Sequence, residues 1–255
     1  MNKIVLITGA TSGIGLACAH KYAAAGDHLI LTGRRKDRLN EIEEELIQAH
    51  GIRVRTLHFD VRDKDAVRTA IASLEGNWKQ VDILINNAGL ALGRDYFEEA
   101  SMDDWETMIH TNISGLLYVT REILPFMIER KKGHIINLGS VAGDDVYERG
   151  NVYCGTKFAV GAISRSMRID LLRHGIKVTN IKPGAVETEF SIVRFHGDKQ
   201  SADKVYEGFT PLSGADIADT IYYCTSLPAH VCINDLDITP LAQANGIYLH
   251  RGPVQ

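Results

Sequence analysis

A tyrosine and a lysine in the segment YCGTK carry the strongest chemical signal of this chain. Tyr153 and Lys157 are four residues apart, so on a helix their side chains share one face. A free tyrosine has a pKa of about 10, too high for efficient proton transfer at neutral pH. A neighbouring ammonium stabilises the phenolate, so we expect Lys157 to lower the pKa of Tyr153. The pair predicts a general acid/base, although the same spacing is common in surface pairs.

A glycine-rich turn follows the first apolar run. The segment TGATSGIG lies between a strand-like run and a helix-like stretch. Glycines let the backbone turn tightly and let a pyrophosphate approach the helix N-terminus. The spacing differs from GxGxxG, and no P-loop Gly-Lys-Ser/Thr follows. The turn predicts a dinucleotide site, with a turn that binds no ligand as the alternative. The expected contacts are Gly9, Thr11, Ser12, Gly13, Ile14 and Gly15.

The residues after the second strand-like run indicate which dinucleotide binds. A site for NAD typically carries Asp or Glu there, which accepts a hydrogen bond from the ribose 2′-hydroxyl. Here the run ends in Arg34 and Arg35, and guanidinium groups form bidentate bonds to a 2′-phosphate. The pair predicts NADP, with two solvated arginines as the alternative. Asp37 is expected to cap the next helix. Asp60 and Val61 are expected at the adenine edge, although Asp60 alone also fits a helix cap.

Short apolar runs alternate with longer amphipathic stretches along the chain. The strand-like runs are 3–8, 29–32, 54–59, 81–86, 134–138, 177–181 and 231–238; the helix-like stretches are 13–25, 38–50, 64–74, 102–129, 152–173 and 215–226. This alternation predicts an α/β fold: a Rossmann-type, doubly wound parallel sheet of about seven strands with helices on both faces. No linker divides the chain, so we expect one domain over 1–255. Within it, we expect a substrate flap at 188–212, where the periodic pattern breaks.

Composition and charge exclude several classes of protein. The chain is 45% apolar and 24% charged, with a net charge of −4, which argues against a basic nucleic-acid surface. Its first apolar run, 4–7, is shorter than a signal-peptide core of about 7 residues or a membrane span of about 20. The four cysteines form no CxxC pair and the histidines form no HExxH. We therefore expect a cytoplasmic protein with reduced thiols and no metal, nucleic-acid or membrane partner.

Five motifs occur in the order typical of the short-chain dehydrogenase/reductase family, which the chain resembles over nearly its full length. They are TGATSGIG, NNAG at 86–89, Asn112, Ser140 and YCGTK. The resemblance implies that Tyr153 transfers a proton to or from the substrate oxygen and that Ser140 hydrogen-bonds this oxygen. It also implies that Lys157 holds the nicotinamide ribose and that Asn112 holds a water in a proton relay. Taken singly, Ser140 also fits a helix cap and Asn112 a kinked helix.

The resemblance carries further implications for the cofactor site and for assembly. The expected additional cofactor contacts are Asn87, Ala88, Gly89, Pro183, Gly184, Val186 and Thr188. The matching helices of the family, here within 102–129, pair subunits. The resemblance therefore implies a homo-oligomer, with a tetramer favoured over a dimer.

Longer segments resemble one branch of this family, the NADP-dependent 3-hydroxy acid dehydrogenases. They are LINNAGLALG, DDWETMIHTN, GHIINLGS, GNVY, EFSIVRFHGD and LPAHVCIN. This branch implies oxidation of serine, allo-threonine or 3-hydroxypropionate, or reduction of the semialdehyde. Reductases of another anionic aldehyde, such as sulfoacetaldehyde, are similar enough to compete. A non-catalytic NADP-binding sensor or scaffold is a third hypothesis, against which the presence of both Tyr153 and Lys157 speaks.

A buried substrate carboxylate needs a cation, and two arginines are candidates. Arg194, in EFSIVRF on the expected flap, is the first choice, and Arg149, before the YCGTK segment, is the second. The acidic residues Asp144, Asp145 and Glu148 lie close in sequence. They predict negative charge at the pocket mouth, suited to a substrate with an ammonium group, with a solvated loop as the alternative.

Overall fold

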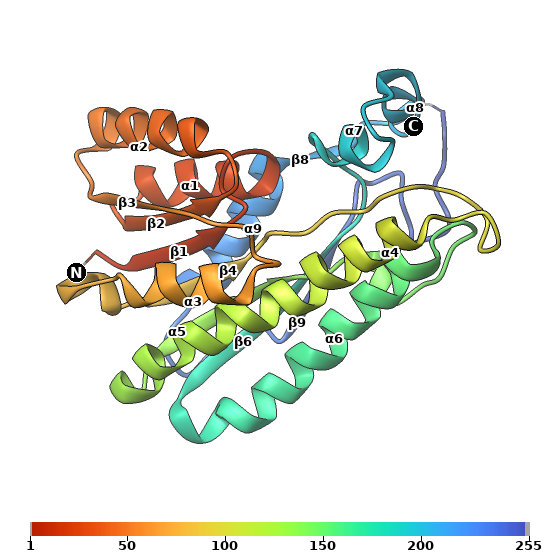
Figure 1. Ribbon diagram of the computed structural model, residues 1–255. Coiled ribbons are helices and arrows are strands. Elements are labelled where there is room, and N and C mark those ends of the chain that lie inside the picture. Colours follow the sequence, from red (N-terminus) through yellow and green to blue (C-terminus); the bar gives the residue numbers. More distant parts are fainter. Residues whose placement is uncertain (1, 253–255) are drawn as a thin grey trace.

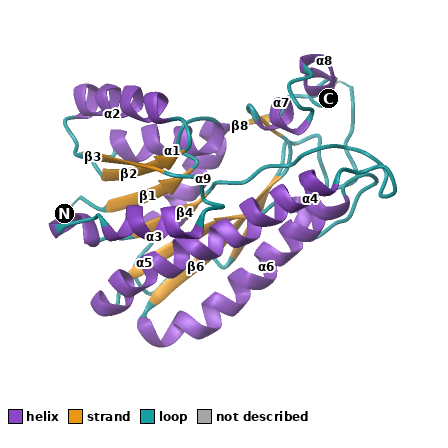
Figure 2. Cartoon of the chain, in the orientation of Figure 1, coloured by secondary structure: helices purple, strands orange, loops and turns teal. Residues whose placement is uncertain are grey.

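A parallel β-sheet forms the centre of the computed structural model, which describes residues 2–252 (Figures 1 and 2). Its strands are β1 (Ile4–Thr8), β2 (His28–Gly33), β3 (Val54–His58), β4 (Ile83–Asn86), β5 (Gly133–Leu138), β6 (Ile176–Pro183) and β9 (Asp235–Ile238). The seven strands pair in the order β3-β2-β1-β4-β5-β6-β9, and every neighbouring pair is parallel. The predicted Rossmann-type sheet is confirmed.

Helices cover both faces of this sheet. They are α1 (Gly13–Ala24), α2 (Lys36–His50), α3 (Lys64–Ala72), α4 (Met102–Ile109), α5 (Leu116–Arg130), α6 (Asn151–Leu171), α7 (Phe190–Arg194), α8 (Lys199–Lys204) and α9 (Gly214–Ser226). Successive strand residues point to opposite faces. In β1, Val5 and Ile7 pack into the core under α1, α2 and α9. Ile4 and Leu6 pack into the core under α3 and α5. Both faces are therefore covered, which explains the continuous apolar runs.

The predicted helix at 102–129 is interrupted. α4 and α5 are separated by a π-helical turn, His110–Gly115, which the apolar periodicity did not reveal. This turn contains Asn112 and brings Gly115 against Val61. The last predicted strand is also shorter than 231–238, because its pairing with β6 begins at Asp235.

The predicted helix cap at Asp37 is wrong, and the alternative role of Asp60 as a cap is not observed. α2 begins at Lys36, so Asp37 lies inside its first turn instead of capping it. The cap of α3 is Asp63, whose carboxylate accepts from the amides of Asp65 and Ala66. Asp60, which precedes this helix, is instead held by Arg62, with Nη2 and Oδ2 2.7 Å apart.

The segment 188–212 contains α7 and α8 and lies between two short strands, β7 (Val186–Glu187) and β8 (Leu212–Ser213), which pair in parallel. The ends of the expected domain, residue 1 and residues 253–255, lie outside the described residues. Across residues 2–252, no helix combines the length and apolar character needed to cross a membrane. Within the same range, no group of three His, Cys, Asp or Glu side chains is arranged to hold a metal ion.

The contact between Gly115 and Val61 gives a test of this packing. A Cβ on Gly115 would lie 2.7 Å from Cγ2 of Val61 and 2.9 Å from its Cβ. We expect Gly115→Ala to lower the free energy of unfolding by about 1–3 kcal/mol through overpacking, as measured by denaturant titration. Gly155→Ala in α6 is the matched control, because a Cβ there meets no atom within 4 Å. Equal stability of the two variants would contradict the tight contact.

Candidate active site

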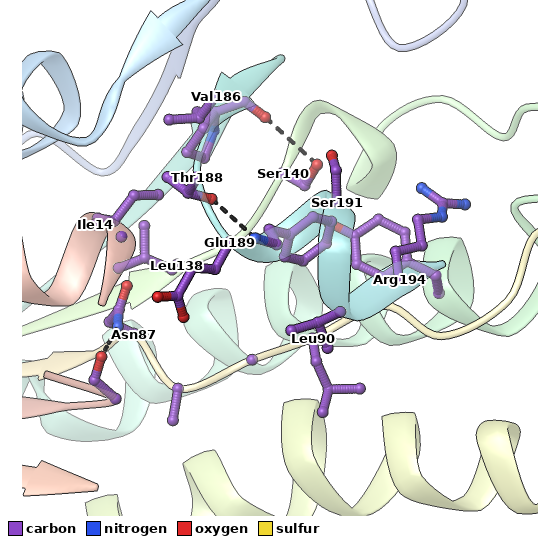
Figure 3. Close-up of a pocket in the computed structure, with 18 of the residues that line it drawn as sticks. Ile14, Asn87, Leu90, Leu138, Ser140, Val186, Thr188, Glu189, Ser191 and Arg194 are labelled. Atoms are coloured by element: carbon purple, nitrogen blue, oxygen red, sulfur yellow. Dashed lines mark hydrogen bonds between the residues drawn. The ribbon is translucent and has the colours of Figure 1, made fainter. Parts of the chain in front are cut away.

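A cavity of about 510 Å³ opens where the strands of the sheet end. In open α/β sheets, ligands bind at the carboxyl ends of the strands. Figure 3 shows Ile14 and Asn87 toward one end of this cavity and Arg194 toward the other. Predicted site residues that line it are Gly9, Thr11, Ser12, Gly13, Ile14, Arg34, Arg35, Asp60, Val61, Asn87, Ala88, Gly89, Ser140, Tyr153, Lys157, Pro183, Gly184, Val186, Thr188 and Arg194. Gly15, Asn112 and Arg149 do not contribute to the lining.

The glycine turn forms a cradle at the first end of the cavity. Gly9 and Gly13 have φ values of 66° and 53°, a conformation that favours glycine. A Cβ on Gly15 would collide with the carbonyl oxygen of Gly9, so Gly15 supports the turn from beneath. The hydroxyl of Ser12 makes no capping bond to α1. First-turn amides of a helix lack intrahelical partners, and they suit a phosphate. The cradle therefore fits the pyrophosphate of a dinucleotide.

Arg34 and Arg35 extend this end of the cavity, and both are exposed. Arg35 donates from Nε to Thr11 Oγ1 (3.1 Å) and from Nη1 to Glu189 Oε2 (3.1 Å). Arg34 Nη1 lies 4.0 Å from Asp60 Oδ2. Burial raises the pKa of Asp60, but the hydrogen bonds from Arg62 and the charge of Arg34 outweigh it and hold that pKa below its usual value. The guanidinium groups of Arg34 and Arg35 form a set of hydrogen-bond donors that suits a phosphate.

Tyr153 and Lys157 lie in α6, and both side chains are buried. Lys157 Nζ lies 5.8 Å from the centroid of the Tyr153 ring and donates to the carbonyl oxygen of Leu138 at 2.8 Å. Ser140, two residues beyond β5, accepts from the amide of Ala142 at 3.1 Å and lines the same cavity. Ser140 therefore caps a short turn, as the alternative interpretation held, while its hydroxyl stays beside the tyrosine.

The acidity of this pair differs from the sequence expectation. Burial raises the pKa of Tyr153, although a hydrogen bond with Ser140 and the charge of Arg194 act to lower it. Burial also lowers the pKa of Lys157 to about 8. The expected net lowering of the tyrosine pKa is therefore wrong for this structure. Desolvation of a fully buried phenol exceeds the stabilisation that its neighbours supply.

Asn112 lies outside the cavity and supports its wall through hydrogen bonds. Its side-chain amide donates to Leu90 O (2.8 Å) and Thr156 Oγ1 (3.0 Å), and its oxygen accepts from the amide of Leu90 (2.9 Å). These bonds tie the π-helical turn to the loop after β4 and to α6. The interpretation of Asn112 as the residue of a distorted helix therefore agrees with the geometry, and its role in a proton relay stays a prediction.

Of the two arginines considered for the substrate anion, Arg194 reaches the cavity. Its Nη1 donates to Tyr147 OH at 3.0 Å and its Nε to Gly93 O at 3.3 Å. Its guanidinium carbon lies 5.5 Å from the centroid of the Tyr153 ring. Arg149 is exposed, with its guanidinium 4.1 Å from the centroid of the Tyr96 ring, outside the cavity. The prediction of Arg149 as an anchor is wrong, because its side chain stacks on the surface.

The three acidic residues predicted at the pocket mouth lie outside the cavity wall, so a role for their charge at the mouth stays a prediction. Asp144 pairs with Lys182 at 2.7 Å, and Asp145 accepts from the amide of Gly246 at 2.9 Å. Glu148 accepts from Tyr96 OH at 3.2 Å. None of these three carboxylates lines the cavity. They belong to the surface loop that the alternative interpretation described.

The sequence analysis missed several side chains of the cavity wall, among them Arg94, Tyr147, Phe190 and Gln243. Tyr147 bonds Arg194, and the Phe190 ring packs 5.8 Å from the Tyr153 ring. Gln243 accepts from the amide of Ala185 at 2.8 Å. Two of these side chains had a signal in the sequence. Arg94 directly follows a glycine in LALGR, and Tyr147 is an aromatic residue six positions before Tyr153. No local pattern marks Gln243, which arrives from a distant part of the chain.

Comparisons with known proteins agree with this geometry. The family model for short chain dehydrogenases matches residues 3–198. The chain is 47% identical to the NADP-dependent 3-hydroxy acid dehydrogenase YdfG of Salmonella typhi, covering 97% of this chain and 99% of the relative. It is also 47% identical to sulfoacetaldehyde reductase 2 of Chromohalobacter salexigens, covering 96% of each. The closed form of a serine dehydrogenase complexed with NADP+ superposes with a TM-score of 0.92 at 46% identity, covering 97% of this chain and 99% of that one.

The buried ammonium of Lys157 predicts an unusual stability change. Its pKa is about 8 in the folded protein against an ordinary 10.5, so below pH 8 the folded state bears the cost of burying the charge. We expect Lys157→Met to raise the free energy of unfolding at pH 7 by about 1–3 kcal/mol. Between pH 8 and 10.5 the folded wild type loses the proton first, so the difference shrinks as the pH rises.

Denaturant titrations at pH 7 and pH 10 measure this difference. A gap of the same size at both pH values would contradict the assignment of the cost to the charge. A variant less stable than the wild type at pH 7 would contradict it as well.

Proposed function

The chain belongs to the short-chain dehydrogenase family, and from this premise we propose that it is an NADP-dependent oxidoreductase acting on small 3-hydroxy acids. It interconverts an acid of the serine, allo-threonine and 3-hydroxypropionate class with its 3-oxo acid or semialdehyde. The observation that carries the proposal is the shared cavity, with a phosphate cradle at one end and Tyr153, Ser140 and Arg194 at the other. The similarity to a 3-hydroxy acid dehydrogenase and to a serine dehydrogenase supports it.

Different parts of the cavity would hold the different chemical groups of NADP. The glycine turn at 9–15 holds the pyrophosphate, Arg34 and Arg35 hold the 2′-phosphate, and Asp60 and Val61 border the adenine. Segments 87–89 and 183–188 border the nicotinamide half, where Lys157 holds the ribose. When bound, NADP accepts or donates the hydride.

The chain's own residues manage the proton. In the oxidative direction Tyr153 takes the proton from the alcohol oxygen, and in the reductive direction it donates one to the carbonyl oxygen. Ser140 donates a hydrogen bond to the same oxygen and so holds it against the phenol. Lys157, largely protonated at neutral pH with a pKa of about 8, stabilises the phenolate when it forms. Asn112 holds a water that connects this lysine with solvent.

Arg194 anchors the substrate carboxylate, and the segment 188–212 acts as a flap. Arg194 lies at the end of α7 and already reaches across to Gly93 and Tyr147. A flap that carries the anion-binding residue closes most favourably when the acid is present, and closure excludes water from the reacting carbon.

We also propose a homo-oligomer, with a tetramer favoured, in the cytoplasm. Ile169 of α6 and the adjacent Leu172 are 77% and 75% exposed, and Leu117 of α5 is exposed as well. Large exposed apolar side chains on the helices over one face of the sheet favour a subunit interface on that face. The four cysteines are free thiols, which suits a reducing compartment.

Turnover with NADP+ and 3-hydroxypropionate or serine tests the function, with the absorbance of the reduced nicotinamide as the measurement. We expect Tyr153→Phe to lower kcat by about 10²- to 10⁴-fold, because the general acid/base is lost. NADP+ binding, measured by calorimetry, should remain. NAD+ should support slower turnover, because Arg34 and Arg35 follow the second strand where an NAD site typically carries the Asp or Glu that accepts from the ribose. Undiminished turnover by Tyr153→Phe, or a preference for NAD+, would overturn the corresponding assignment.

The anchoring role of Arg194 is tested by substrate charge. We expect Arg194→Ala to raise KM for acids by about 30-fold, the scale of removing one partner of a buried charge pair. KM for an uncharged alcohol such as propan-1-ol should change far less. An equal rise for acids and alcohols would remove Arg194 as the anchor.

A further inference from the structure

The charges that line the cavity are distributed unevenly. Its acidic lining residues, Asp60 and Glu189, lie at the cofactor end, paired with Arg62 and Arg35. The other end is lined by Lys157, Arg194 and Arg94, with no carboxylate in the wall between them. Within residues 2–252, neither Arg94 nor Arg194 forms an ion pair.

Arg94 is brought to this end by contacts between two distant segments. The amide of Gly93 donates to the carbonyl oxygen of Arg194 at 2.9 Å, and Arg194 Nε donates back to Gly93 O at 3.3 Å. Gly93 has a φ of 69°, a left-handed conformation that glycine adopts readily. The chain turns there, and the next side chain, an otherwise exposed arginine, lines the cavity. In Figure 3, Arg194 marks this end of the site.

The two guanidinium groups influence each other. Burial and the charges of Arg194 and, to a smaller extent, Arg149 lower the pKa of Arg94, with Tyr147 and Glu148 acting in the opposite direction. Glu148 carries the nearby negative charge, but it accepts from Tyr96 OH and lies outside the cavity wall. A substrate anion relieves the repulsion between the two arginines, whereas an ammonium group at this end adds to it.

We propose that Arg94 is a second specificity-determining residue which, together with Arg194, selects anionic substrates that lack an ammonium group over zwitterions such as serine. The inference rests on the proposed function and narrows its substrate class. A hydroxy acid with a single carboxylate and a hydroxy sulfonate share the required chemistry, since each offers oxygens to both guanidinium groups. Serine offers the same carboxylate but places its ammonium beside the same two cations.

Binding of unreactive probes tests the proposal independently of turnover. The full-length protein is titrated by calorimetry, with NADP+ present, with propionate, ethanesulfonate and alanine. We expect the wild type to bind either anion about ten-fold more tightly than alanine. Arg94→Gln should weaken both anions about five-fold, as suits a partly exposed charge, and should change alanine binding far less. Arg94→Lys should keep most of the anion affinity.

Arg149→Gln is the matched control, because Arg149 lies on the same stretch of surface but outside the cavity. We expect its affinities to equal those of the wild type. Thermal unfolding of each variant verifies that it is folded. Propionate bound more tightly than ethanesulfonate would identify a carboxylate as the preferred anion, and the reverse order a sulfonate; either order supports the proposal.

Steady-state kinetics with NADP+ complete the test. We expect the ratio of kcat/KM for 3-hydroxypropionate to kcat/KM for serine to fall about five-fold in Arg94→Gln. Alanine bound as tightly as propionate by the wild type, or an Arg94→Gln variant that weakens all probes equally or none, overturns the proposal. Selective anion binding without turnover of any acid keeps the role of Arg94 and removes the proposed function. Turnover of acids by the wild type, with a kcat/KM ratio that Arg94→Gln leaves unchanged, removes the role of Arg94 and keeps the proposed function.

Discussion

The site depends on a buried ammonium, that of Lys157. Taking an ammonium out of water is costly unless polar groups replace the lost hydration, and the depressed pKa of about 8 reflects that cost. The hydrogen bond to the carbonyl oxygen of Leu138 at 2.8 Å ties the charge to the end of β5. Because α6 and the sheet share this contact, the ammonium and the phenol of Tyr153 keep a fixed relation to the cavity floor. A cation in this position is favourable only when negative charge develops beside it.

The rest of the fold keeps that arrangement rigid. β5 is buried along its whole length, between strands that are themselves covered on both faces. The turn after Ser140 packs closely on α6, since a Cβ on Gly143 would lie only 2.8 Å from the carbonyl oxygen of Lys157. Asn112 braces the opposite wall through bonds to Leu90 and Thr156. These contacts hold the tyrosine and the lysine on α6 and the serine in the short turn directly after β5, which favours precise positioning.

The sequence was informative where structure follows from local pattern and misleading where it follows from burial or distant contacts. The sheet and its helices were predictable because apolar runs buried on both faces differ from amphipathic stretches. The π-helical turn was not predictable, because the segment 102–129 carries apolar residues on more than one face and its periodicity does not mark where the helix changes. The direction of the Tyr153 pKa depends on how completely the ring is buried, which spacing to Lys157 does not reveal. Arg149 and Arg194 are chemically equal in sequence, and packing alone separates them.

The two ends of the cavity differ in construction, and this difference has a consequence for specificity. The cofactor end relies on the backbone of one continuous turn, where added Cβ atoms would collide or strain the chain. The substrate end is assembled from side chains on segments joined by long-range contacts, such as that between Gly93 and Arg194, 101 residues apart. A substitution can change the charge of a surface that is built from side chains without disturbing the sheet. A surface that is built from the backbone cannot be altered in this way. The substrate class is therefore set by individual wall residues such as Arg94, while the dinucleotide cradle is set by the fold itself.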